Sequence, residues 1–265
     1  MSNSDETHEL NASQPVIKVA KPWIAETYAD QISDLAESYD DEDDVSLRGE
    51  SISISIKEYI DQWDSEHQDE VKDGIIKGNG TVEGSAIESV RQLIEEEVDA
   101  DVEVGAPHSD GWAVKWTDPV EEMKIDISGP LSRRTGEMVA IRGRVRHRTD
   151  PIPWFRTRHY ECDWCMTQIK EPLSYDPENI VRGDVHSPKE CRNEACNAGR
   201  DNFRVVTEQS DMRDYQYLTV EQSPGVDGST PSKIGCWLFG EGRLTDASEG
   251  ERVTVIGRLR LNPDS

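Results

Sequence analysis

The sequence predicts an α+β protein in which a helical bundle is followed by a β-barrel that carries a metal-binding insertion. Through the first hundred residues, apolar side chains recur every three to four positions, which is typical of amphipathic helices. After about residue 119 the pattern changes to alternation with period two, which indicates strands. Two close pairs of cysteines interrupt the strand-like part. We therefore predict a bundle over residues 22–118, a barrel over 119–160 and 197–265, and an insertion over 161–196.

The helical elements follow from runs of apolar residues on one face. Residues 1–21 are polar and aperiodic, and we expect a disordered tail there. Pro22 is expected to open the first helix, since proline is favoured in the first turn. "SISISI" predicts a short strand before a second helix, and "NG" at 79–80 predicts a turn. The apolar faces of the three predicted helices contain, in turn, Ile24, Tyr28, Ile32, Leu35 and Tyr39; Ile56, Tyr59, Ile60 and Trp63; and Ile87, Val90, Leu93, Ile94 and Val98.

The strand-like half contains two segments that resemble each other, "GEMVAIRGRVR" (136–146) and "GERVTVIGRLR" (250–260). In each, a Gly-Glu turn leads into alternating apolar residues, a glycine and an Arg-x-Arg exit. A glycine inside a strand permits the sharp coiling that a small closed barrel needs. With "FRVVTEQ", "DYQYLTVEQ" and "KIGCWLFGEG" there are about five strands, which favour an OB-fold β-barrel. A generic β-sandwich is the alternative.

The cysteine spacing predicts a structural zinc site. "CDWC" and "CRNEAC" supply Cys162, Cys165, Cys191 and Cys196, and each short turn presents two sulfurs to one ion. Disulfides are disfavoured in a reducing cytoplasm, a redox dithiol explains only one pair, and an iron–sulfur cluster is a further alternative. His186 is a substitute ligand or a solvated loop residue. Four protein ligands leave no open position, so this zinc is expected not to catalyse. Cys236, inside "IGCWLF", is expected in the core.

The formal charge of −25, from 54 acidic and 29 basic residues, is spread through the helix-like segments as well as the ends. Such a surface keeps a folded protein hydrated in concentrated salt, so we expect a halophilic archaeal protein. An acidic tail protein and a nucleic-acid mimic are the alternatives. The sequence has no secretory signal and no apolar run long enough to cross a membrane. We expect a cytoplasmic protein with no membrane partner.

A basic island stands out against this acidic background. Residues 129–160 contain eight arginines and two acidic residues, a formal charge of +6. Arg142, Arg144, Arg146 and Arg148 alternate, so a regular strand would place them on one face about 7 Å apart, close to the phosphate repeat of an extended single strand. These four, with Arg156 and Arg158, are predicted to bind DNA. The alternatives are ion pairs with local carboxylates or contacts with a neighbouring subunit. Candidates for base stacking are Trp154, Phe155, His159 and Tyr160.

The segment "GEMVAIRGRVRHRTDPIPWFRTRHYECDWC" resembles the first OB strands and zinc knuckle of archaeal minichromosome maintenance (MCM) replicative helicases. "DYQYLTVEQSPGVDGSTPSKI" and "EGERVTVIGRLR" are similar to later strands of that N-terminal region, so the resemblance covers about residues 120–262. It implies a DNA-binding, ring-forming module, commonly a hexamer, with single-stranded or double-stranded DNA in a central channel. Lys233 stands where the family usually has Arg beside the Pro, and we include it among the predicted DNA-binding residues.

The sequence departs from the family at two further points. Glu221-Gln222 replaces the usual Gln-Glu, and no G-x-x-x-x-G-K-[ST] phosphate loop occurs, so this chain is expected not to hydrolyse ATP by that route. We expect either an N-terminal fragment of a longer protein or a shortened stand-alone relative. The competing functions are a zinc-containing single-stranded-DNA-binding protein similar to replication protein A, a zinc enzyme, and a regulatory partner that inactivates a helicase ring by co-assembly.

Overall fold

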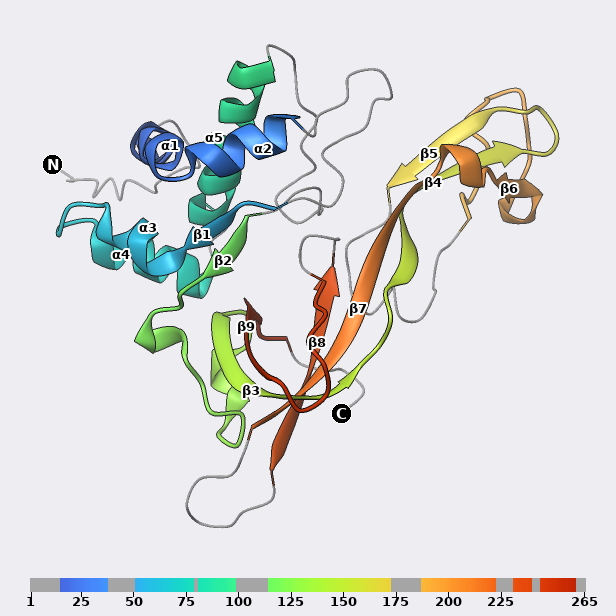
Figure 1. Cartoon of the computed structure of the whole chain (residues 1–265). Helices are drawn as coiled ribbons and strands as arrows, with labels where there is room; N and C mark the ends of the chain where they lie inside the picture. Colours follow the sequence, from blue (N-terminus) through green and yellow to red (C-terminus); the bar gives the residue numbers. More distant parts are fainter. Residues whose placement is uncertain are drawn as a thin grey trace, which may run out of the picture.

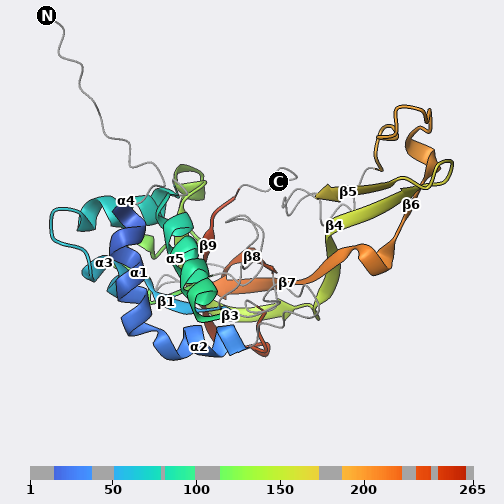
Figure 2. The same ribbon diagram turned by 90° about the horizontal axis from the view of Figure 1, so that it is seen from above.

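A computed structural model of the chain describes residues 15–37, 51–78, 81–98, 114–172, 187–222, 231–239 and 244–260. The described residues form three parts: a helical part, a coiled β-sheet, and a long arm of β-strands (Figures 1 and 2). The sheet lies between the other two parts, and the arm projects away from the helices. None of the helices in the described part of the chain is long and apolar enough to cross a membrane.

The helical part is built from α1 (Pro15–Thr27), α2 (Ala29–Glu37), α3 (Ile56–Asp61), α4 (Gln68–Lys77) and α5 (Thr81–Val98). Their apolar faces meet in one core that includes Ile24, Ile32, Tyr59, Ile75 and Ile94. Aromatic rings pack edge to face within it, with the Tyr59 ring centroid 5.7 Å from that of Trp23 and 5.5 Å from that of Trp116. The predicted apolar faces are therefore the buried ones.

The helix boundaries differ from those predicted. Helix α1 begins at Pro15, so residues 15–21, which we expected in a disordered tail, are helical, and Pro22 lies inside the helix. Burial explains this, because Ala20 packs in the core with no exposed surface. The first predicted helix is divided at Tyr28 into α1 and α2, and the second is divided into α3 and α4. Helix α5 begins at Thr81, four residues earlier than expected. The predicted turn at 79–80 and Tyr39 lie outside the described residues.

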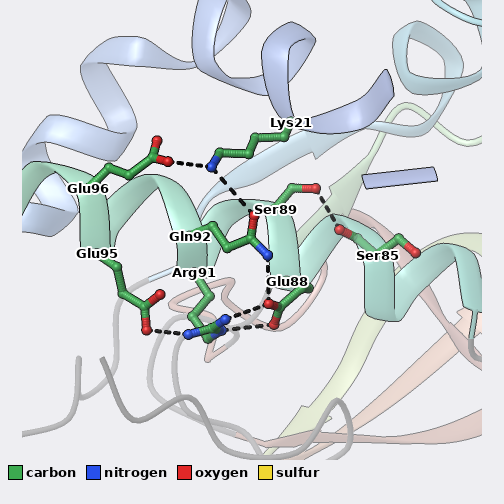
Figure 3. A network of polar contacts seen from close by, with 8 residues as sticks. All are labelled: Lys21, Ser85, Glu88, Ser89, Arg91, Gln92, Glu95 and Glu96. Atoms are coloured by element: carbon green, nitrogen blue, oxygen red, sulfur yellow. Dashed lines mark hydrogen bonds and ion pairs between the residues drawn. The ribbon is translucent and has the colours of Figure 1, made fainter. Parts of the chain in front are cut away.

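A network of hydrogen bonds and ion pairs connects α1 to α5 (Figure 3). Lys21 on α1 places its Nζ 2.6 Å from Oε1 of Glu96 and 3.4 Å from Oε1 of Gln92. Along α5, the Arg91 guanidinium bonds to both Glu88 and Glu95. The hydrogen bond from Arg91 lowers the pKa of the half-buried Glu88 carboxyl. Arg91 thus neutralises part of the acidic charge of α5, because it lies three residues after Glu88 and four residues before Glu95.

The predicted "SISISI" strand is present as β1 (Ser53–Ser55), which pairs in parallel with β2 (Lys115–Thr117). Ser55 also caps α3, since its side-chain oxygen accepts a hydrogen bond from the Glu58 amide at 3.3 Å. This small sheet joins the helical core to the segment that enters the barrel. The described chain then passes through short 3₁₀ turns at Glu121–Met123 and Leu131–Arg134.

The coiled sheet contains β3 (Met138–Arg148), β7 (Asp211–Gln222), β8 (Ser232–Phe239) and β9 (Arg252–Arg258). Strand β3 pairs with β9 along its first half and with β7 along its second half, and β8 pairs with β7, all antiparallel. One side of these strands forms the barrel core, whose buried members include Val139, Ile141, Val145, Leu218 and Val220. Cys236 is buried in the same core, as predicted.

The arm is formed by β4 (Ile152–Cys162), β5 (Gln168–Pro172) and β6 (Phe203–Val205). Because β4 pairs with β7 near the barrel and with β5 and β6 farther out, the arm continues the barrel sheet (Figure 1). Residues 197–205, which we assigned to the barrel, belong to the arm instead. The cause is local pairing, since the Cys191 amide donates to the Ala198 carbonyl and β6 pairs with the end of β4.

The helical part and the barrel share apolar core. Met123, Met138 and Ala140, with partly buried Ile256 on β9, pack into the helical cluster rather than into the barrel cluster. Met138, Ala140 and Ile256 lie on the side of the sheet opposite to the barrel core, and we call this side the outer face. A second contact is made where Gly78, the left-handed C-cap of α4, lies against the guanidinium of Arg258.

Replacing Gly78 by Ala is expected to lower the melting temperature by several degrees. A side chain at φ +65° costs about 1–2 kcal/mol, and the new Cβ would overlap Nη1 of Arg258. Gly250→Ala is the matched control, because Gly250 also has positive φ (+89°) but has no neighbouring atom within 4 Å of an added Cβ. Any destabilisation of Gly78→Ala beyond that of Gly250→Ala measures the cost of moving the flexible Arg258 guanidinium away from α4, and an unchanged melting temperature in Gly78→Ala would contradict the prediction.

Candidate metal centre and nucleic-acid interface

Four cysteines meet at the end of the arm. Cys162 ends β4 and Cys165 follows in a tight turn, whereas Cys191 and Cys196 come from the loop that returns towards β6. All four Sγ atoms lie within 4.8 Å of one another. The Met166 amide donates to the Cys162 carbonyl at 2.9 Å, and the Cys196 amide donates to the Asn193 carbonyl at 2.8 Å. Each pair is therefore held by its own hydrogen-bonded turn.

The sulfur geometry fits a tetrahedral ion. Zinc–sulfur bonds of about 2.3 Å in a tetrahedron place the sulfurs about 3.8 Å apart. The Sγ atoms of Cys162 and Cys196 are 3.7 Å apart, and those of Cys165 and Cys191 are 3.5 Å apart. These distances are far longer than a disulfide bond. The thiol–hydroxyl contact with Thr167, 3.1 Å long, lowers the pKa of Cys165 to about 6. Burial and the neighbouring sulfurs raise the pKa of Cys191 and Cys196, so a metal ion would have to displace their protons.

Little else holds this end of the arm together. The buried members of its apolar cluster are Cys162, Cys191 and Ala198, with Cys165, Cys196 and Phe203 partly buried against them. Such a cluster is too small to order the loops by hydrophobic burial alone. The donor set and the small size of this core are both consistent with a metal site, such as a zinc site, at these four cysteines. His186, the alternative ligand, lies outside the described residues.

The predicted row of four arginines on β3 is interrupted. Val145 pairs with Val220 and His147 pairs with Thr219, so Arg146 is an extra residue in a β-bulge. Beyond the bulge the alternation reverses, and Arg148 lies opposite Leu218 of the barrel core. Its Nη1 donates to the Thr245 carbonyl at 2.8 Å. The prediction that Arg148 shares a face with Arg142 and Arg144 is therefore wrong, because a bulge shifts the period by one residue.

Five basic side chains remain together on or beside the outer face, and we call this set the cationic face: Arg142, Arg144, Arg146, Lys233 and Arg252. Each of the five is exposed. Arg144 lies directly opposite Arg252 on β9 and opposite Glu221 on β7. Arg252 was missing from our sequence prediction, because its position beside Arg144 depends on the pairing of β3 with β9.

One carboxylate lies within the cationic face. Oε2 of Glu221 is 3.2 Å from Nε of Arg146 and 3.9 Å from Nζ of Lys233. Arg144 donates to the Gly250 carbonyl at 2.9 Å. Among the described residues, no acidic side chain lies within ion-pair distance of Arg142, Arg144 or Arg252. Within the described residues, three of the five members of the cationic face thus have no carboxylate partner, and Arg146 and Lys233 share one.

The second group of predicted DNA-binding residues follows a second bulge. Phe155 pairs with Met212 and Thr157 pairs with Asp211, so Arg156 is the extra residue, and its side chain lies outside the described part of the structure. The guanidinium carbon of Arg158 lies 4.3 Å from the centroid of the Phe155 ring, a cation–π contact on the arm. Arg158 is thus separated from the cationic face.

The predicted stacking residues are placed differently from expectation. Trp154 and Tyr160 are 6% and 1% exposed, so both are core residues and neither offers a ring to solvent. Phe155 is covered by Arg158, and His159 is half-buried on the arm. The half-buried aromatic residues of the outer face are instead Tyr215 and Tyr217 on β7 and Trp237 on β8. Period-two alternation in "DYQYLTVEQ" was the sequence signal for two of them.

The fold and the site together define the class of protein: an OB-type barrel with a helical part on its outer face and a four-cysteine arm inserted between its first two strands. Comparison with known families gives a match for residues 131–263 to the MCM OB domain. The match spans half of the chain, and the chain belongs to the MCM OB domain family.

A solved structure supports the arrangement of the fold. The crystal structure of the N-terminal domain of an archaeal MCM is 17% identical in sequence, with a TM-score of 0.59 over 92% of this chain and 87% of that one. The likeness includes the helical part, for which the sequence offered no sharp motif. At this level of identity it bears on the fold alone. Comparison with curated proteins gives no match.

Proposed function

We propose that this chain is the DNA-binding and ring-forming N-terminal region of an MCM-type replication helicase, with the ATPase activity supplied outside these residues. In this proposal the ring is a homo-oligomer, commonly a hexamer, and the cationic face grips DNA. The four cysteines hold one structural zinc ion. The acidic surface favours a salt-rich archaeal cytoplasm, where the protein would be associated with the nucleoid.

The pair formed by Arg144 and Arg252 carries the proposal. Like charges directly opposite each other in a sheet are destabilising unless an anion lies between them, and both side chains are exposed. Arg142 extends the pair along β3 by two residues, which is about 7 Å. Guanidinium groups offer planar donors that match phosphate oxygens, so the arrangement suits a phosphate backbone that runs along the strand.

The shared core between the helical part and the barrel distinguishes this proposal from its main alternative, a stand-alone single-stranded-DNA-binding protein similar to replication protein A. A stand-alone binder does not need the helical part. Here Met138 and Ala140 of the first barrel strand pack into the helical core, so the two parts are built as one unit. Such a fixed orientation of the helical part relative to the barrel favours a module that assembles into a ring.

The deciding measurement is the solution mass by light scattering in concentrated KCl, where surface charges are screened, with and without single-stranded oligothymidylate. The expected result is a particle of about six chains that forms or tightens on DNA. A monomer that binds the oligonucleotide would support the single-strand-binding alternative. A monomer that binds none in low or high salt would overturn the proposal.

A further inference from the structure

An aromatic cluster on the outer face borders buried rings, since the Tyr215 ring centroid is 5.9 Å from that of the buried Phe239. Tyr215, Tyr217 and Trp237 lie on β7 and β8, and the Trp237 ring centroid is 4.5 Å from that of Tyr217 and 5.8 Å from that of Tyr215. All three are half-buried. Neither the helical cluster nor the barrel cluster includes them. Three large aromatic residues therefore lie on the side of the sheet that does not face the barrel interior.

Gly235 lets one of these rings lie along the sheet. A Cβ added at Gly235 would lie 2.2 Å from the Tyr217 hydroxyl oxygen and 2.8 Å from its Cζ. The ring therefore extends across β8 in the space that a side chain at position 235 would fill. An aromatic ring laid along a strand presents a broad apolar surface, and aromatic rings of this kind are the surfaces on which unpaired bases stack.

The cationic face adjoins this cluster. On β7, Glu221, Thr219, Tyr217 and Tyr215 share the outer face, and on β8 Lys233, Gly235 and Trp237 lie opposite the first three. Lys233 and Trp237 are four residues apart on one strand, or about 13 Å. A strand whose phosphates contact the cationic face could thus reach the aromatic cluster within about two nucleotides. The charge of the neighbouring surface selects an anionic polymer.

We propose that Tyr215, Tyr217 and Trp237 form a stacking platform for the unpaired bases of a single-stranded nucleic acid, next to the cationic face. This inference rests on the proposed DNA-binding function and names the form of nucleic acid that this face takes. Duplex DNA keeps its bases stacked inside, so it cannot use the platform. Stacking also weakens less than phosphate contacts as salt rises, because it releases few counterions.

The test compares oligothymidylate with an abasic strand of the same length by fluorescence anisotropy over a range of salt concentrations. Wild-type protein is expected to bind the thymidylate strand about tenfold more tightly, as stacking of one or two bases implies. Trp237→Leu is expected to remove that difference while it leaves the affinity for the abasic strand and the slope of log Kd against log salt unchanged. Trp164→Leu is the matched control, since Trp164 is 63% exposed on the arm.

A second pair of variants protects the test against misfolding of Trp237→Leu. Tyr217→Phe keeps the ring and is expected to bind like wild type, whereas Tyr217→Leu is expected to bind the thymidylate strand about tenfold more weakly. Equal binding of the two strands by wild-type protein, unchanged affinity in both leucine variants, or tighter binding of duplex DNA would overturn the platform while DNA binding stands. Failure of wild-type protein to bind any strand would overturn the proposed function as well.

Discussion

Cys162→Ser is expected to abolish binding of the proposed zinc ion and to disorder the end of the arm, while the helical part and the barrel stay folded. Serine cannot replace a thiolate ligand, and metal binding contributes on the order of 10 kcal/mol to the folding of such modules. The cluster of three buried residues at this end offers almost no other source of stability. Hydrogen exchange should therefore rise in residues 187–205 and remain low in β3 and α5.

Cys236→Ser is the matched control, because the same atom is changed in a cysteine that is buried in the barrel core. This variant is expected to be less stable but to keep one zinc per chain by elemental analysis. Zinc should also be released as the pH falls, since protons compete with the metal for the thiolates. Retention of one zinc per chain by Cys162→Ser would show that the four sulfurs are not the ligand set.

Loss of Arg142 and Arg144 is expected to weaken DNA binding and to reduce its dependence on salt. These two arginines of the cationic face precede the bulge on β3. Arg142→Ala/Arg144→Ala is expected to reduce the slope of log K against log salt by about 1.4, or about 0.7 for each phosphate of a single strand that is no longer neutralised. Affinity in low salt should fall at least about tenfold. Both side chains are exposed, so the melting temperature should change little. Fluorescence anisotropy with oligothymidylate over a salt series measures both the slope and the affinity.

Two controls separate position from charge. Lys18→Ala/Lys77→Ala removes the same charge from exposed residues of the helical part and is expected to leave the slope unchanged. Arg148→Ala lies on the same strand, but the Arg148 side chain bonds to the Thr245 carbonyl on the barrel-core side, so this variant should be less stable without a change in slope. If Arg148→Ala reduces the slope by as much as each arginine of the double variant does, then Arg148 binds DNA together with Arg142 and Arg144. The bulge would then not separate Arg148 from the other two.

The sequence alone determined the α+β class, the helical part before the barrel and the four cysteines. These features follow from local physics. Apolar residues that recur every 3.6 positions in a helix, or every second position in a strand, mark the face of that element that is buried. Two cysteines in a short turn are near each other in any fold. Ile24, Ile32 and Val139, for example, are buried on the faces that their spacing indicates.

The tertiary structure alone decided which charged and aromatic residues share a surface. Bulges at Arg146 and Arg156 arise from the pairing of β3 and β4 with β7, and one extra residue moves every later side chain to the opposite face. Arg252, Tyr217 and Trp237 join the candidate site through cross-strand register, which spans more than a hundred residues of sequence between β3 and β9. Residues 15–21 belong to α1 and Ala20 is buried in the helical core, whereas we had assigned them to the tail that precedes them. Such pairings depend on contacts between distant segments, and no local period records them.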